Sequence, residues 1–393
     1  MLVFISDIHL TDGTTGPHNI DENDVEFFWN DIQVDGVKPK DIELVILGDF
    51  FDVIRSTQWK DIKPWDNNNT SVSQTAINIV QNTIKINKKP LDFMKDLSSK
   101  GVKIRYIIGN HDRLINAVPE ARKLIRECLS IEKSPDPFPL EFWDKNLSIY
   151  ATHGHEADVY NSFPWPDVTP IGDAIVTMLL NPFPGHPSLK GLSIKDSLKE
   201  IDNLRPATIA PLWIEHCIKS YGEDVGSKVK GAWKELVDNF YKDPFVKKWF
   251  DEYDSWLNPV DKADALQIAF EYFTESSMQG ILEKILEIRN DFYKPKEEYL
   301  HKALDYMNEK GCDYIVFGHT HEPCIHLIEE SKKGGKFYIN SGTWRDRIVM
   351  GEPRKKIVPF APLETISYVQ FFNDTEMKET GRRFEVWDGS IGC

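Results

Sequence analysis

The 393-residue sequence has few cysteines, and they form no paired motif. The five are scattered and odd in number: Cys128, Cys217, Cys312, Cys324 and Cys393. No CxxC pair occurs among them, so the pattern does not indicate a disulfide framework. This usage is typical of reduced thiols and predicts a cytoplasmic protein.

Long apolar runs and a leader segment are also lacking. No apolar run reaches the roughly 18 residues that a membrane-spanning helix needs. Met1 leads directly into an apolar strand pattern, with no basic region, apolar signal segment or cleavage site before it. We therefore expect no membrane span and no export by a standard signal.

Basic clusters are few and short. The formal net charge is −15 at pH 7, and basic clusters such as Lys332-Lys333 and Arg354-Lys355-Lys356 are only two or three residues long. A long nucleic acid needs an extended basic surface, which these clusters do not supply. The charge balance thus disfavours long nucleic acid and favours a small charged substrate held by metal ions.

What the sequence does contain is a series of apolar runs that end in metal-binding side chains. In Val45–Asp52, the apolar run ends at Gly48 and Asp49 follows at once. Four other apolar runs lead into Asp7-Ile8-His9, Asn110-His111-Asp112, His153-Gly154-His155 and His319-Thr320-His321. Because parallel strands deliver their carboxyl ends to one edge of a sheet, these side chains should meet there. The sequence therefore predicts a metal site at that edge.

The donors in these runs are carboxylate, amide and imidazole groups, without thiolate. Two divalent metals about 4 Å apart need several such ligands and one anionic bridge. The mixture suits Mn, Fe, Zn, Co or Ni better than Mg or Ca, whose sites prefer oxygen ligands alone. Asp49, which stands alone in its run, is the natural bridging carboxylate.

The organisation of the chain changes after this site. Helices are expected near 21–32, 74–99, 119–129 and 297–309, and strands near 313–317, 337–340, 367–372 and 383–387, the last two as a hairpin. Between 161 and 298 no strand–acid unit occurs, and helical patterns lie near 171–180, 207–221, 226–241, 245–256 and 260–292. This stretch is far longer than an ordinary connection. We predict a core made of residues 1–160 and 299–393, with a helical cap insertion at 161–298.

The insertion leaves the core shortly after His155, so we expect it to cover the metal-binding edge. Its first part holds an apolar group of seven residues: Phe163, Trp165, Ile175, Met178, Leu179, Leu180 and Phe183. These side chains either line a pocket for an aromatic, nucleoside or acyl part of a substrate, or pack the insertion onto the core. Apolar stripes of this kind are usually packing.

The five runs, taken together and in order, resemble the signature blocks of the calcineurin-like metallophosphoesterase superfamily. The resemblance covers residues 1–155 and about 312–345, and not the insertion. It implies an α/β fold, a two-sheet sandwich with helices outside (α-β-β-α), and a dinuclear metal centre. Mn is the favoured metal of the two-ion centre.

The resemblance also implies a role for each residue of the blocks. Asp7, His9 and His321 would bind the first metal. Asn110, His153 and His319 would bind the second, and Asp49 would bridge the two. A water or hydroxide held between the ions would attack phosphorus. His111 resembles the general acid of the family, and Asp52 the carboxylate that orients it.

Several of these assignments have alternatives. Asp112 competes with Asp52 as the partner of His111, and Asp52 alternatively caps the turn that follows it. Arg55 and Arg113 either bind a phosphate oxygen or form salt bridges. His155 either contacts substrate or plays a merely polar role. The turn Asn340–Arg345 is expected to be structural, with Trp344 and Arg345 as candidate pocket residues.

The resulting hypothesis is a metal-dependent hydrolase of phosphoric esters, a phosphodiesterase or pyrophosphatase acting on a small or nucleotide-like substrate. A phosphomonoesterase of the same superfamily is the nearest alternative, and the motifs do not separate the two. A nuclease fits the charge less well. A scaffold that binds metals without catalysis is the alternative from another class, and the complete set of candidate ligands argues against it.

Overall fold

The strands of the core alternate between two environments. In the computed structural model, Leu2 and Phe4 of the first strand pack between two sheets, whereas Val3 and Ile5 pack against helices on the other face. Successive side chains of a strand point to opposite faces, so a fully apolar strand lies buried on both sides. The structure describes residues 1–16, 20–66, 70–162, 169–205, 209–253, 263, 266–267, 270, 295–330, 335–351 and 358–389.

The first sheet has five strands in the order β13-β12-β1-β2-β3. Strands β1 (Leu2–Ile5), β2 (Glu43–Leu47) and β3 (Lys103–Ile107) are parallel. Strand β12 (Ile366–Phe371) runs antiparallel to β1 and to β13 (Phe384–Gly389). The predicted C-terminal hairpin is thereby confirmed.

The second sheet also has five strands, in the order β4-β5-β7-β9-β8. Strands β5 (Ile149–Thr152), β7 (Tyr314–Phe317) and β9 (Lys336–Asn340) are parallel. Strands β4 (Glu141–Asp144) and β8 (Cys324–Glu329) pair antiparallel at the two edges. All five strands that precede the metal-binding blocks are therefore parallel members of the two sheets.

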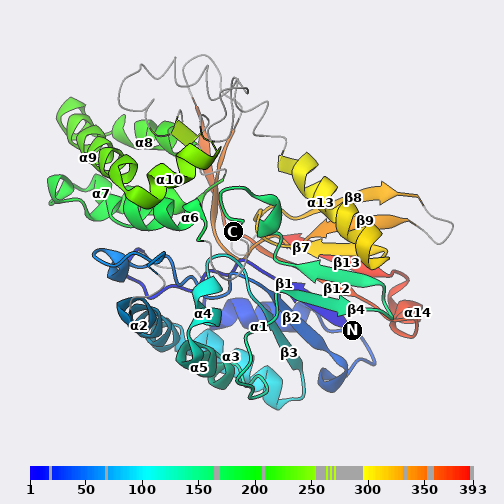
Figure 1. Cartoon of the computed structure of the whole chain (residues 1–393). Coiled ribbons are helices and arrows are strands. Elements are labelled where there is room, and N and C mark those ends of the chain that lie inside the picture. Colours follow the sequence, from blue (N-terminus) through cyan, green and yellow to red (C-terminus); the bar gives the residue numbers. More distant parts are fainter. Residues whose placement is uncertain are drawn as a thin grey trace.

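Helices cover both outer faces of the sandwich (Figure 1). The face of the first sheet carries α1 (Glu22–Asp31), α2 (Thr70–Ile86), α3 (Lys88–Ser99) and α5 (Pro119–Cys128), with the short α4 (Arg113–Ala117) beside them. The face of the second sheet carries α13 (Pro295–Lys310). This arrangement confirms the α-β-β-α sandwich.

One predicted helix is two. The apolar spacing over 74–99 predicted a continuous helix, but α2 and α3 meet at Asn87. The Asn87 side-chain amide donates to the carbonyl oxygens of Thr83 and Thr11. A side chain that hydrogen-bonds backbone in this way competes with the helix, which is why the chain changes direction there.

The insertion is helical in its described part. The short η3 (His155–Ala157) precedes it. The insertion contains α6 (Ile171–Ala174), the π-helix η4 (Ile175–Leu180), η5 (Phe183–Gly185), η6 (Pro187–Leu189), α7 (Ile194–Leu198), η7 (Lys199–Asn203), α8 (Ala210–Ile218), α9 (Glu223–Lys242) and α10 (Pro244–Tyr253). These match the first four predicted helical segments. The fifth, over 260–292, lies almost entirely outside the described residues.

The apolar group at the start of the insertion is packed where the structure describes it. Leu179, Leu180 and Phe183 are buried in the main core, and Ile175 and Met178 pack against it. Phe163 and Trp165 lie outside the described residues. The five described members thus follow the packing interpretation.

Among the described contacts that fasten the insertion to the core, two join it to segments far along the chain. Its strand β6 (Leu204–Arg205) pairs in parallel with β10 (Arg347–Met350), which also pairs with β11 (Phe360–Leu363). On another side, Lys63 forms an ion pair with Asp243, and the ring of Trp65 stacks on Phe245 at 4.8 Å between centroids. The sequence analysis predicted neither contact, because β6 is two residues long and the others join distant segments.

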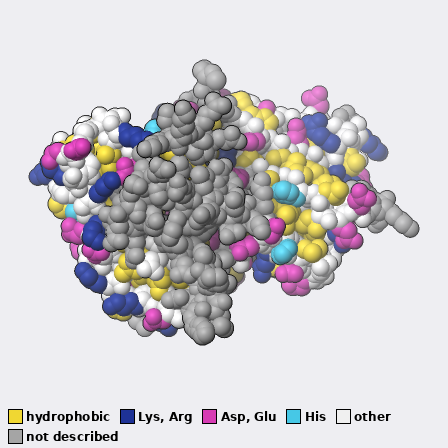
Figure 2. All heavy atoms as spheres, turned by 90° about the horizontal axis from the view of Figure 1, so that it is seen from above, with side chains coloured by type: hydrophobic (Ala, Val, Ile, Leu, Met, Phe, Trp, Pro, Cys, Tyr) yellow, Lys and Arg dark blue, Asp and Glu magenta, His cyan; other side chains and the backbone are white. Residues whose placement is uncertain are grey.

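Charged side chains of both signs are interspersed on the surface. On the face drawn in Figure 2, the described Lys and Arg side chains alternate with Asp and Glu and form no continuous basic band. Within the described part of the chain, no helix is both long and apolar enough to cross a membrane. The four described cysteines, Cys128, Cys217, Cys312 and Cys324, are free.

Candidate metal centre

The loops that carry the candidate ligands have an unusual backbone. Seven described non-glycine residues have positive φ, and five of them are candidate ligands: Asp7 (53°), His9 (53°), Asp49 (52°), His319 (68°) and His321 (60°). For L-residues this conformation costs about 1–2 kcal/mol each. Such strain persists only where surrounding contacts enforce it, and it gathers at functional sites.

Backbone hydrogen bonds between the loops enforce this geometry. The amides of Asp7 and His9 donate to the carbonyl oxygens of Gly48 and Asp49, at 3.2 and 2.8 Å. The amide of His111 donates to Asp49 Oδ1 at 2.8 Å. At Gly109 a Cβ atom would overlap the same carboxylate oxygen, so only glycine lets the loop after β3 approach. The three loops of the first sheet are therefore locked together around Asp49.

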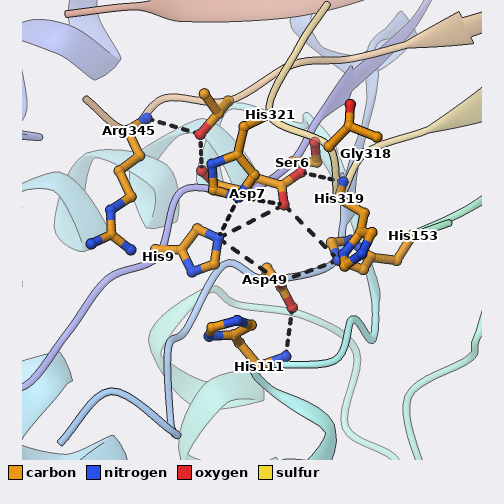
Figure 3. Close-up of polar contacts among 12 residues, drawn as sticks. Ser6, Asp7, His9, Asp49, His111, His153, Gly318, His319, His321 and Arg345 are labelled. Atoms are coloured by element: carbon orange, nitrogen blue, oxygen red, sulfur yellow. Dashed lines mark hydrogen bonds and ion pairs between the residues drawn. The ribbon is translucent and has the colours of Figure 1, made fainter. Parts of the chain in front are cut away.

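The first group of candidate ligands converges on one point. Nε2 of His9 and Nε2 of His321 lie 3.1 Å apart, and Asp7 Oδ1 lies 3.7 and 3.3 Å from them (Figure 3). Asp7 comes from the end of β1 and His321 from the loop after β7, so both sheets contribute. Two imidazole nitrogens and one carboxylate oxygen thus surround a common position.

The second group lies beside the first. Nε2 of His153 is 3.1 Å from Asn110 Oδ1, and His153 and His319 fall within a cluster whose ligand atoms lie within 4.8 Å of one another. Nε2 of His319 bonds Asp158 Oδ2 at 3.0 Å, which leaves Nδ1 to face the cluster. His153 Nδ1 donates to the Leu47 carbonyl oxygen at 2.8 Å, which turns Nε2 toward the site.

Asp49 stands between the two groups. Its Oδ2 is 3.8 Å from His9 Nε2 in the first and 3.2 Å from His153 Nε2 in the second. Its other oxygen is held by the His111 amide. One oxygen within reach of both groups is the geometry that a bridging carboxylate requires.

The residues fit divalent cations. Asp7 Oδ1 is buried and accepts no hydrogen bond within the described residues, although a buried carboxylate oxygen normally has a partner. The Nε2 atoms of His9 and His321 lie at hydrogen-bonding distance, where one bound cation satisfies both lone pairs. Carboxylate, amide and imidazole donors on buried loops match a transition-metal site.

Charges inside the site reinforce one another. Burial alone would raise the pKa of Asp49, but His153 and His111 outweigh it and hold that pKa below the usual carboxyl value. Burial lowers the pKa of His153, but the charges of Asp49 and Asp7 outweigh the effect of burial and raise this pKa to about 10. The carboxylates therefore attract positive charge strongly, whether it is a proton or a metal cation.

Asp52 joins a candidate ligand to the candidate acid. Its Oδ2 accepts from His9 Nδ1 at 2.9 Å, and its Oδ1 from His111 Nδ1 at 2.8 Å. Burial lowers the pKa of His111, but the charges of Asp52 and Asp49 outweigh the effect of burial and raise this pKa to about 10. Asp52 Oδ1 also accepts the amide of Arg55, so the capping role weighed for Asp52 coexists with the orienting one.

Asp112 has other partners. Its carboxylate accepts the Gly109 amide and the Tyr106 hydroxyl, at 2.6 and 2.7 Å. Burial and the nearby Asp49 raise its pKa to about 7. Asp112 therefore closes the loop after β3, and it is Asp52 that bonds His111.

The two predicted arginines pair with carboxylates of the insertion. Arg55 contacts Asp202 with 2.8 Å between Nη1 and Oδ2, and Arg113 pairs with Asp173. All four side chains are buried. His155 is buried beside His153 and His319, and burial lowers its pKa to about 4.

The sequence analysis did not identify Asp158 and Asn161 as site residues. Asp158 accepts from His319, and Asn161 accepts from the Asn110 amide at 3.2 Å and donates to Asp158 at 2.8 Å. Asp158 lies three residues after His155, so its only sequence signal was proximity to that block. Arg345, named only as a candidate pocket residue, pairs with Asp202 at 2.7 Å and lies beside His9 (Figure 3).

The sequence was compared with curated proteins and with models of protein families. No curated protein matches the sequence. The family model for calcineurin-like phosphoesterase matches residues 1–323, which include all five blocks and the described part of the insertion. The chain therefore belongs to the calcineurin-like phosphoesterase family, whose members are phosphoric ester hydrolases with a dinuclear divalent metal centre.

Proposed function

We propose that this enzyme is a phosphodiesterase or pyrophosphatase that acts on a small or nucleotide-like substrate. The observation that carries the proposal is the position of Asp52, whose two oxygens bond the His9 and His111 imidazoles. A proton donor is thereby held at a fixed distance from the metal ligands. A scaffold that only binds metals has no need of such a donor.

In this proposal Asp7, His9 and His321 hold one cation, and Asn110, His153 and His319 hold the other. Asp49, whose Oδ2 lies between the two groups, would serve both cations. Manganese is the metal we favour, with Fe, Zn, Co and Ni as alternatives that the same donors accept. The free cysteines are compatible with the cytoplasm, which stays the predicted location.

Bound divalent ions would supply a water of lowered pKa and neutralise charge on the phosphoryl oxygens. With such a water as nucleophile, its oxygen would form a new bond to phosphorus as the bond from phosphorus to the leaving oxygen breaks, and its proton would pass to solvent. His111 donates its proton to the leaving oxygen, and Asp52 holds the imidazolium in place for that transfer. His9, bonded to the same carboxylate, keeps its Nε2 turned toward the cation.

The test compares two chromogenic esters. Protein stripped of metal and resupplied with Mn is assayed with bis(p-nitrophenyl) phosphate and with p-nitrophenyl phosphate. We expect metal-dependent hydrolysis of the diester in preference to the monoester. In His111→Ala, diester hydrolysis should fall about 10²- to 10⁴-fold, because the general acid is lost.

Two outcomes would overturn this proposal. Preference for the monoester would make the enzyme a phosphomonoesterase. No hydrolysis of either ester, or of nucleotide and diphosphate substrates, by protein that holds two Mn ions would indicate a scaffold. Metal content measured on the same sample distinguishes a scaffold from a poorly loaded enzyme.

A further inference from the structure

A buried cluster of charge lies next to the candidate acid, outside the set of metal ligands. Asp202, from η7 of the insertion, contacts Arg55 and Arg345 of the core, at 2.8 and 2.7 Å. Arg345 Nε also donates to Asn203 Oδ1 at 2.7 Å. Two guanidinium groups thus share the Asp202 carboxylate, and Arg345 also forms a longer ion pair with Asp52, with 3.9 Å between Nη1 and Oδ2.

Two guanidinium nitrogens of this cluster, Arg55 Nε and Arg345 Nη1, make no hydrogen bond within the described residues. Arg345 Nη1 is buried, and the whole side chain is 10% exposed. A guanidinium offers five N–H groups, and leaving charged donors of a buried side chain unpaired is unfavourable. Such a nitrogen is a candidate for contact with a bound anion.

The Asp52 carboxylate lies near Arg345 Nη1 but accepts no hydrogen bond from it. Asp52 Oδ2 lies 3.9 Å from Arg345 Nη1, beyond hydrogen-bond distance. Asp52 already accepts hydrogen bonds from His9, His111 and the Arg55 amide. The unpaired N–H groups of Arg345 are therefore available to a group that comes from outside the protein.

The position of Arg345 indicates which part of a substrate it meets. It lies on the side of His9 opposite to His153 (Figure 3), and thus away from the second cation position. Asp52 connects this side directly to His111, the group that faces the leaving oxygen in the proposed reaction. A group that contacts Arg345 would therefore belong to the leaving part of the substrate and not to the phosphoryl group under attack.

We infer that Arg345, supported by Arg55 and Asp202, binds a second anionic group on the leaving part of the substrate, such as the other phosphate of a diphosphate. This inference rests on the proposed function and makes it narrower: the preferred substrate is a phosphoric anhydride, and a simple diester, which lacks the second anionic group, is a poorer one. Arginine suits the task because its planar fork binds phosphate oxygens in pairs.

The test measures binding of two probes to Mn-loaded protein by calorimetry: inorganic phosphate and imidodiphosphate, a diphosphate that resists hydrolysis. Wild-type protein should bind imidodiphosphate more tightly than phosphate. Arg345→Gln should weaken imidodiphosphate binding about 10- to 100-fold, the loss expected for a charged hydrogen-bonding group, and phosphate binding less than about 3-fold. Arg345→Lys should restore part of the difference.

A structural role for the cluster makes a different prediction. If Arg345 only fastens the insertion, Asp202→Asn should reproduce the loss seen in Arg345→Gln. If Arg345 binds the anion, Asp202→Asn should keep the preference for imidodiphosphate, because the arginine loses a competing carboxylate. Lys63→Met, which removes the half-exposed ion pair with Asp243 on another side of the insertion, is the matched control and should change neither affinity.

The inference is overturned if wild-type protein binds both probes equally, or if Arg345→Gln weakens both to the same extent. Failure of the proposed function gives a separate result, because it shows in hydrolysis and metal content. Diester hydrolysis without a preference for imidodiphosphate leaves the proposed function standing and rejects the anion site. Selective binding of imidodiphosphate without hydrolysis of any substrate supports the anion site and rejects the proposed function.

Discussion

On the first side of the metal centre, His9 is oriented by Asp52, a residue of the loop after β2. On the second side, His319 is oriented by Asp158, a residue between β5 and the first described helix of the insertion. Asp52 is fully buried, whereas the Asp158 side chain is 21% exposed. The first side is thus built within the core, and the second depends on the segment that leads into the insertion.

This difference shows how the insertion and the core can contribute separately to one candidate site. In the proposed centre, a change at Asn161 would act on the second cation position directly through Asn110 and Asp158. On the first side the insertion contributes Asp202, which contacts Arg55 and Arg345 and does not bond the His9 or His111 imidazoles. The two sides should therefore respond differently to mutation, and the following experiments test that expectation.

The largest effect is expected where the two sides meet. Asp49→Asn removes the charge of the one carboxylate that contacts both groups, so both cations should be lost together. We expect less than one bound metal per chain and a fall in kcat of about 10³-fold or more, since metal ions supply several kcal/mol of transition-state stabilisation. Elemental analysis and diester hydrolysis measure the two effects.

A matched control for this variant is Asp12→Asn. Asp12 is a buried carboxylate of the loop after β1, and it bonds Ser56 and Gln58 instead of facing the histidines. Its substitution should leave metal content unchanged. Retention of two metals by Asp49→Asn would show that the two sides are independent and that Asp49 does not bridge them.

On the first side, Asp52→Asn should disturb His9 and His111 together. The amide has one acceptor oxygen for two imidazole N–H groups, so one imidazole must change its tautomer or turn away. By analogy with other carboxylates that orient a catalytic histidine, kcat should fall about 10²- to 10⁴-fold. Excess Mn should not restore it, because the acid as well as the ligand is affected. A full rescue by Mn would contradict the assignment of His111.

On the second side, Asp158→Asn should affect metal affinity more than chemistry. His319 loses the charge of its partner, and such partners typically contribute 10- to 100-fold to metal affinity. Activity measured against Mn concentration should shift by about that factor and return to within a few-fold of wild type at saturation. If excess Mn cannot restore the activity of Asp158→Asn, as is expected for Asp52→Asn, then the two sides of the site do not differ in the way described.

The candidate ligands of both sides could be located from the sequence because each comes just after an apolar strand. A strand that is buried on both faces is recognisable without its neighbours, and its end fixes the position of Asp49 or His153 to within a residue or two. The same reasoning predicted the sandwich and the helical character of the insertion.

The supports on the second side were not predictable in the same way. Asp158 and Asn161 lie in an irregular segment, where no period relates a residue to a direction in space. Asp202 is brought to Arg345 by η7 and by the two-residue strand β6, which is too short to give a pattern. The break at Asn87 depends on a hydrogen bond to Thr11, 76 residues away in the chain. Each of these features is set by tertiary contacts.

The smallest effect is expected at Asn161. Its side chain accepts from Asn110 and donates to Asp158, so it connects one candidate ligand of the second cation to the support of another. Asn161→Ala should weaken the affinity for Mn about 2- to 10-fold, which is the range for the loss of one or two neutral hydrogen bonds. The kcat at saturating Mn should not change. The measurement is again activity against Mn concentration.

The double variant with Asp158→Asn decides how Asn161 acts. If Asn161 works by holding the Asp158 carboxylate, its removal should matter less once Asp158 is altered, and the combined shift should be smaller than the product of the single shifts. A combined shift equal to the product of the two single shifts would mean that Asn161 acts through Asn110 alone. In that case the second side has two separate supports, Asp158 and Asn161, whereas the first side relies on the single carboxylate of Asp52.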